Sequence, residues 1–155
     1  MKKTLLLFVF LISAIYSTNA QNLLKLDLNV STAVNDYFGD VNLGLGAELS
    51  YLIPLSERLS FGPNAGVTVF FVNGSDNNSL VPLTASGRFH FNERFFAGAD
   101  LGYSFIFIDE VDGGFYYRPK VGCDFNTISV LASYTGITQN NGQFSFVSLG
   151  IEFGL

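Results

Sequence analysis

The stretch 43-LGLGAELSYLI-53 alternates between apolar residues and small or polar ones. Leucine, alanine, tyrosine or isoleucine occupies every second position from Leu43 to Ile53, and the positions from Gly44 to Ser50 between them hold glycine, glutamate and serine. Successive side chains of a β-strand point to opposite faces of the sheet, so this pattern predicts a strand with one apolar and one polar face. Which face meets water then decides the fold.

The same period of two recurs along the rest of the chain, and no convincing period of 3.6 residues accompanies it. Clusters of Asp, Asn and Gly, which favour turns, separate the alternating segments. The pattern predicts eight strands, over residues 23–34, 43–53, 59–72, 80–91, 94–108, 115–125, 128–137 and 144–155. The sequence therefore indicates an all-β domain.

The connections between these strands alternate in length. The longer ones are polar and cover residues 35–42, 73–79, 109–114 and 139–143. The shorter ones cover residues 54–58, 92–93 and 126–127. Successive connections of an antiparallel meander lie at opposite ends, so all longer loops are expected at one end and all shorter turns at the other. This asymmetry is typical of transmembrane barrels.

The first twenty residues have the pattern of a secretory signal peptide. Lys2 and Lys3 precede an apolar run over residues 5–16, and Thr18 and Ala20 place small residues at a cleavage site. The alternative is a retained membrane anchor, but the run is shorter than the roughly 20 residues that a spanning helix needs. We expect cleavage after Ala20 and one mature domain over residues 21–155. Without the two lysines, six basic and thirteen acidic residues give that domain a net charge of −7.

The composition excludes several classes of protein. Only 14% of the 155 residues are charged, against about 25% in ordinary soluble domains. Eight Lys and Arg against thirteen Asp and Glu disfavour nucleic-acid binding. A single cysteine excludes a disulfide scaffold, and 15% aromatic residues exclude a disordered chain. The shortage of charge calls for an outer surface that is not covered by water.

The charged residues within the predicted strands all fall on the polar face, which they share with glycine and serine. They are Lys25, Asp27, Glu48, Arg88, Asp100, Arg118, Lys120, Asp124 and Glu152. A soluble lipocalin-like barrel would turn this face to water, whereas an outer-membrane barrel turns it inward. Small residues between a few long charged ones suit the narrow lumen of eight strands, and the opposite face would aggregate in water. We therefore predict a closed eight-stranded antiparallel up-and-down transmembrane β-barrel.

With its signal peptide, eight alternating strands, short turns and amphipathic last strand, the chain resembles the small outer-membrane β-barrel family typified by OmpA and OmpX. The last strand alternates at Val147, Leu149, Ile151 and Phe153, as in the family's assembly signal, although the final residue is Leu155 where the family usually has an aromatic residue. The resemblance implies insertion into a bacterial outer membrane by the barrel-assembly machinery and contact with outer-membrane lipid. We expect a monomer.

Charges enclosed in a narrow lumen must pair, because an isolated buried ion is costly. We predict a polar network in which Arg88, Arg118 and Lys120 meet the carboxylates of Glu48, Asp100 and Asp124. Closure of the barrel would bring Lys25 and Glu152 to the same rim as an ion pair. We favour a structural plug over the alternative, an ion pathway.

Two further groups of residues are candidate sites. The longer loops hold acidic residues that could bind a cation, although exposed acidic turns are the simpler interpretation. These residues are Asp76, Asp109, Glu110 and Asp112. Strict alternation also turns a set of apolar side chains inward near the long-loop end, namely Phe70, Ile106, Tyr116, Phe144 and Phe146. Strand ends that project from the bilayer, a β-bulge or an apolar pocket at the mouth would each account for this set.

Enzymatic activity is not expected. The resemblance includes lipid-A-modifying enzymes that use histidine with serine and an acid near the outer leaflet, but the one histidine here, His90, falls near the short-turn end. We expect no catalytic residue, cofactor or metal. The leading hypothesis is a structural or surface-interaction protein with acidic extracellular loops and a surface partner that the sequence does not identify. The alternatives are a narrow pore, a carrier of apolar ligands at the mouth and, least favoured, an enzyme acting on lipid A.

Overall fold

The structure is a computed structural model that describes residues 23–35, 41–72, 78–107, 113–140 and 142–155. Its strands are β1 (Leu24–Ala33), β2 (Val41–Tyr51), β3 (Ile53–Pro54), β4 (Leu59–Val72), β5 (Asn78–His90), β6 (Phe95–Phe107), β7 (Gly114–Phe125), β8 (Ile128–Gln139) and β9 (Gly142–Gly154). In the described ranges, no helix is long and apolar enough to cross a membrane. The bounds agree with the predicted segments to within two residues, apart from the division of segment 43–53 between β2 and β3.

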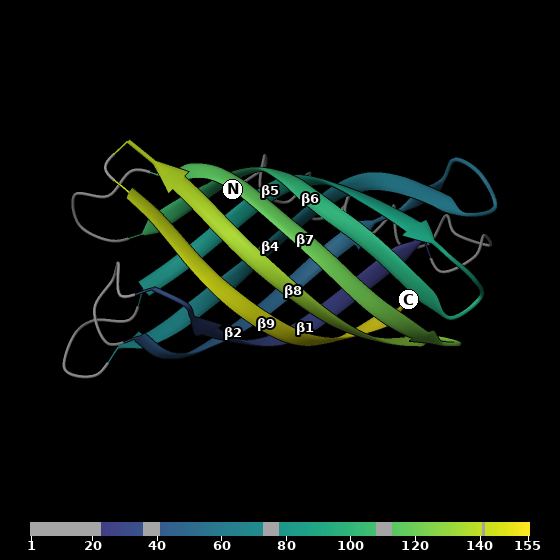
Figure 1. The fold of residues 1–155 in the computed structure, drawn as a ribbon, viewed down its shortest axis with the longest axis horizontal. Coiled ribbons are helices and arrows are strands. Elements are labelled where there is room, and N and C mark those ends of the chain that lie inside the picture. Colours follow the sequence, from purple (N-terminus) through teal and green to yellow (C-terminus); the bar gives the residue numbers. More distant parts are fainter. Residues whose placement is uncertain (1–22, 36–40, 73–77, 108–112, 141) are drawn as a thin grey trace, which may run out of the picture.

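The strands form one closed antiparallel barrel (Figure 1). β1 pairs with β2, and each strand from β3 to β9 pairs with its neighbours in the sequence within that range. β1 also pairs with β9, so that Lys25 faces Gly154 and Ala33 faces Phe146. Pairing between β2 and β4 completes the ring. The prediction of a closed, all-antiparallel barrel is confirmed.

The two-residue strand β3 continues β2 along the same wall. Ser50 pairs with Asn64 and Ile53 pairs with Phe61, so the register against β4 is unchanged across the break. The interruption lies opposite Gly62 and Pro63, and proline has no N–H to donate to a ladder. The wall is therefore built from eight strands, as predicted, one of which is interrupted.

The two faces of the wall differ as the alternation predicts. Leu101, Val121 and Leu149 point outward with 53%, 58% and 68% of their surface exposed. Ser86 and Asp100, on the inward face, are completely buried. In the described strands, every charged side chain belongs to the inward set, and the outer surface is a belt of Leu, Val, Ile, Phe and Tyr. This belt requires lipid rather than water around it.

The short turns at the right-hand end of Figure 1 have the local chemistry that tight turns need. The Asn92 side chain accepts hydrogen bonds from the backbone N–H groups of Arg94 and Phe95, at 2.9 and 2.8 Å. Asn126 adopts a φ of 60°, the left-handed conformation that asparagine tolerates better than most residues. These turns fix the register of the strands that they join.

Candidate functional site in the barrel lumen

The centre of the lumen contains an ion cluster around Arg118. Its guanidinium donates to both carboxylate oxygens of Glu48 on the far wall, and its Nε donates to Asp100 Oδ2 at 2.7 Å. Lys120 Nζ reaches the other oxygen of Asp100 at 2.7 Å and the Ser86 hydroxyl at 3.0 Å. Glu48, Asp100, Arg118 and Lys120 are at most 5% exposed. Strands β2, β5, β6 and β7 are thus tied together across the lumen.

A second pair lies nearer the short-turn end. The two terminal nitrogens of Arg88 donate to the two oxygens of Glu152 at 2.8 and 2.6 Å. The Arg88 guanidinium carbon also lies 4.1 Å from the centre of the Phe96 ring, a cation–π contact. Lys25 Nζ lies 4.0 Å from Glu152, the rim pair that strand closure predicts. Arg88 and Lys25 border a cavity of about 190 Å³.

Asp124 takes a different partner from the one expected. It lies at the short-turn rim, where its Oδ2 is 2.9 Å from His90 Nε2 and its Oδ1 accepts a hydrogen bond from Ser129. No lysine or arginine of the described residues forms an ion pair with it. Arg88 likewise binds Glu152, and not Glu48, Asp100 or Asp124. The expected single network is therefore divided into a central cluster, the Arg88–Glu152 pair and a rim contact.

Asp27 differs from the other lumen charges. It is 5% exposed, and its Oδ1 has no hydrogen-bond partner among the described residues. Within those residues no Lys, Arg or His nitrogen lies within 4.0 Å of its carboxylate. Its partners across the strands are Glu48 and Glu152, both acidic.

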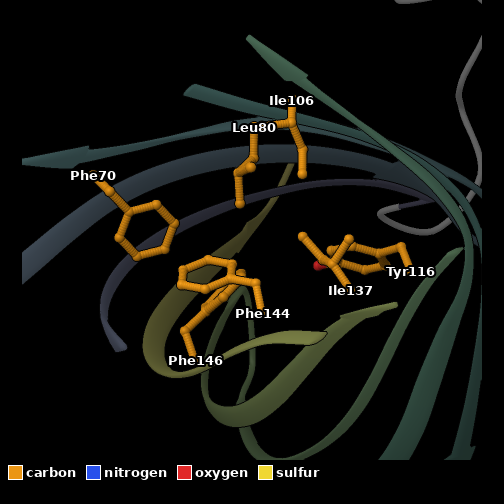
Figure 2. Close-up of a cluster of buried hydrophobic side chains, with 7 residues drawn as sticks. All are labelled: Phe70, Leu80, Ile106, Tyr116, Ile137, Phe144 and Phe146. Carbon is orange, nitrogen blue, oxygen red and sulfur yellow. The ribbon is translucent and has the colours of Figure 1, made fainter. Parts of the chain in front are cut away.

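The long-loop half of the lumen is filled by an apolar plug (Figure 2). We use this name for the seven buried side chains Phe70, Leu80, Ile106, Tyr116, Ile137, Phe144 and Phe146. The rings of Phe70, Phe144 and Phe146 pack on one another with centroids 5.1 to 5.5 Å apart. The predicted mouth residues therefore converge in the lumen and fill it with their own side chains. Leu80 and Ile137 join them, and these two residues were not among the predicted mouth residues.

The whole of the predicted cation site lies outside the described residues. Asp76, Asp109, Glu110 and Asp112 belong to ranges that the structure does not describe. Among the residues that it does describe, no group of three or more His, Cys, Asp or Glu is arranged to hold a metal ion.

Some contacts in the lumen could not be predicted from the sequence pattern. The Phe96 ring beneath Arg88 and the Ser86 hydroxyl on Lys120 lie on the inward face with many similar residues. Counting from the turn between β7 and β8 does place Ser129 opposite Asp124 and Ser133 opposite Lys120, and the structure pairs them in this way. Local register can thus be read from the sequence, whereas contacts across the lumen cannot.

The lumen and the apolar belt together define a transmembrane β-barrel. The chain is similar to several solved structures of that fold. Neisserial surface protein A superposes with a TM-score of 0.62 at 14% identity, over 85% of this chain and 96% of that one. A de novo designed transmembrane β-barrel gives 0.60 at 10% identity, over 88% and 98%. The outer membrane enzyme PagL gives 0.56 at 14% identity, over 84% and 99%.

No family model matches the chain, and no curated protein matches it. The fold is that of the small OmpA- and OmpX-like outer-membrane barrels. These three similar structures are a surface protein, an enzyme and a designed protein, so the fold alone does not assign an activity.

Proposed function

We propose that this chain is an integral outer-membrane protein with a non-conducting lumen, and that its role is structural or is carried out by its loops at the cell surface. The observation that carries the proposal is the double closure of the lumen. The central ion cluster crosses the lumen from β2 to β7, and the apolar plug fills the half of the lumen nearer the long loops. The surface and outer-membrane assignments of the similar structures support the location.

Planar-bilayer recording tests the closed lumen. We expect purified wild-type barrel to give no stepwise conductance above that of a protein-free bilayer. The double variant Arg118→Ala/Phe144→Ala removes one side chain from the central ion cluster and one from the apolar plug. It should open intermittent conductance and so provides a positive control. A steady, size-selective current through the wild-type protein would instead favour the narrow pore.

Epitope labelling tests the surface role. We propose that the long-loop end faces outward, as in other transmembrane barrels. An epitope inserted after residue 75 should be detected on intact cells, and one inserted after Asn92 only after permeabilisation. The reverse pattern of labelling would place the short turns outside and refute the assignment.

The carrier and the enzyme are less well supported. An apolar ligand at the mouth would have to displace the rings of Phe70, Phe144 and Phe146, which already contact one another. PagL establishes that this fold can carry an enzyme. Here, however, His90 binds Asp124 at the short-turn rim, and Ser129 donates to Asp124 rather than to the histidine. This arrangement provides no activated serine.

A further inference from the structure

The buried charges of the lumen do not balance. Seven charged side chains of the described residues are buried, and they comprise four acids and three bases. The acids are Asp27, Glu48, Asp100 and Glu152, and the bases are Arg88, Arg118 and Lys120. Four negative and three positive charges leave a net charge of −1 inside a barrel surrounded by lipid. An uncompensated buried charge of this kind is strongly unfavourable.

The excess negative charge belongs to Asp27. Arg118 is shared by Glu48 and Asp100, and Lys120 also binds Asp100. Arg88 is engaged by Glu152 through both of its terminal nitrogens. Each buried cation is therefore committed to a carboxylate other than that of Asp27.

The charged groups that surround Asp27 come from β1, β2, β7 and β9. Glu48 on β2 and Glu152 on β9 are its cross-strand partners, and Lys25 is two positions away on its own strand, 4.0 Å from Glu152. Arg118 and Lys120 of β7 act on it electrostatically from across the lumen. Two adjacent carboxylates oppose a third negative charge at this position.

The space around Asp27 suits a very small cation. A Cβ atom added to Gly150 would lie 2.4 Å from Asp27 Oδ1, so the carboxylate lies directly on the β9 backbone. The described residues include no metal-binding group of three or more His, Cys, Asp or Glu. A proton needs no such coordination shell. The 190 Å³ cavity at the short-turn end is lined by Arg88 and by Lys25, which is two positions from Asp27 on the same strand.

We propose that Asp27 binds one proton from the surrounding water in the folded barrel at neutral pH, which makes the lumen electrically neutral. The bound proton also turns a group that can only accept hydrogen bonds into a donor, between two carboxylates that are acceptors. Asp27 is thus a proton-binding site built into the wall between β2 and β9.

Proton binding at Asp27 makes the stability of the folded barrel depend on pH. An aspartate in the unfolded chain loses its proton near pH 4, so above that pH folding takes up one proton at Asp27. The folding equilibrium constant should then fall by up to tenfold for each unit of rising pH, until the folded carboxyl group also ionises. The stabilisation is fully present below about pH 4 and is lost as the pH rises.

Equilibrium unfolding in lipid vesicles between pH 5 and pH 8 tests the proposal, with Asp27→Asn compared against wild type so that other titrating groups cancel. We expect the wild-type constant to fall with pH relative to Asp27→Asn, by up to tenfold per unit. The exposed-turn variant Glu57→Gln, which makes the same replacement of a carboxyl group by an amide, should keep the wild-type slope. Parallel curves for wild type and Asp27→Asn would overturn the proposal. So would a difference between them that depends on sodium concentration at fixed pH and ionic strength.

Infrared spectroscopy keeps the proposal testable if Asp27→Asn does not fold. A protonated carboxyl group has a C=O stretching band that is distinct from the bands of a carboxylate. We expect this band in the folded wild-type protein at pH 7. Its absence from the wild-type spectrum would refute proton binding.

Discussion

The Arg88–Glu152 pair allows the energetics of the lumen to be measured with a double-mutant cycle. We consider the variants Arg88→Met, Glu152→Met and the two together. Methionine keeps much of the length of either side chain and can still pack on the Phe96 ring. Arg88 is 2% exposed and Glu152 is also 2% exposed, so solvent screens their interaction very little.

Arg88→Met should be the most damaging change. It leaves the Glu152 carboxylate with only Lys25, at 4.0 Å, and makes the net charge of the buried set more negative by one unit. Removing one partner of a buried pair costs about 3–5 kcal/mol. This cost corresponds to roughly two to four powers of ten in the unfolding constant.

Glu152→Met should cost less than Arg88→Met. Asp27 lies beside Glu152 in the ladder and has no cation within 4.0 Å among the described residues, so it can release its proton and pair with the freed guanidinium. The double variant restores the net charge of the buried set to its wild-type value. Apolar replacement of a whole buried pair is often neutral or stabilising, so we expect its stability to lie within about 1 kcal/mol of wild type.

The assay is equilibrium unfolding in lipid vesicles, followed by far-ultraviolet circular dichroism because the chain has no tryptophan to serve as a fluorescent probe. A coupling free energy of about 3 kcal/mol or more between the two sites is expected from the cost of a broken buried pair. Additive effects, with the double variant as unstable as the sum of the single ones, would refute the reasoning. Equal losses for the two single variants would refute the role given to Asp27.

Three further outcomes follow from the packing, the backbone and the rim. Phe144→Ala should lower the free energy of unfolding by about 3–5 kcal/mol, measured by the same assay, and a loss below 1 kcal/mol would mean that the plug is not tightly packed. Gly62→Ala should be destabilising because a Cβ there would lie 1.7 Å from the Tyr51 carbonyl oxygen, whereas Gly87→Ala, with no atom closer than 4.0 Å, should be tolerated; equal stabilities would contradict this contrast. His90→Ala should leave the mass spectrum of lipid A unchanged, and loss of an acyl modification would show that the barrel is an enzyme.

Most of the fold could be predicted from the alternation of apolar and polar residues with a period of two. It placed the strands to within two residues and turned the charges inward, because each strand has one face in lipid and one in the lumen. The break at Leu52 could not be read in this way, since it depends on Pro63 in the neighbouring strand rather than on the sequence of β2 itself. Alternation thus predicts which side chains share a face of a strand. It does not predict where the hydrogen-bonded pairing with a neighbouring strand is interrupted.

The lumen could be predicted less completely. Turn length fixes which residues face each other in a hairpin, so the pairing of Lys120 with Ser133 could be counted from the sequence. The Arg88–Glu152 contact joins residues 64 positions apart. It depends on how far the strands are staggered around the ring and on how far each side chain reaches, and neither quantity is encoded in a local pattern. The inward positions of the aromatic residues could be predicted from the alternation. Their packing on one another could not, because it depends on the same stagger of the strands.

The pairing of β1 with β9 has a consequence for the order of folding events. This seam joins the first and last strands of the described chain, with Lys25 opposite Gly154. Until it closes, both strands present unpaired backbone groups, which hydrocarbon does not tolerate. Where nothing else pairs with these edges, a stable ring cannot grow one strand at a time within the bilayer. Unassisted insertion should therefore be concerted, and its slow step should be the meeting of the two described strands that are farthest apart along the chain.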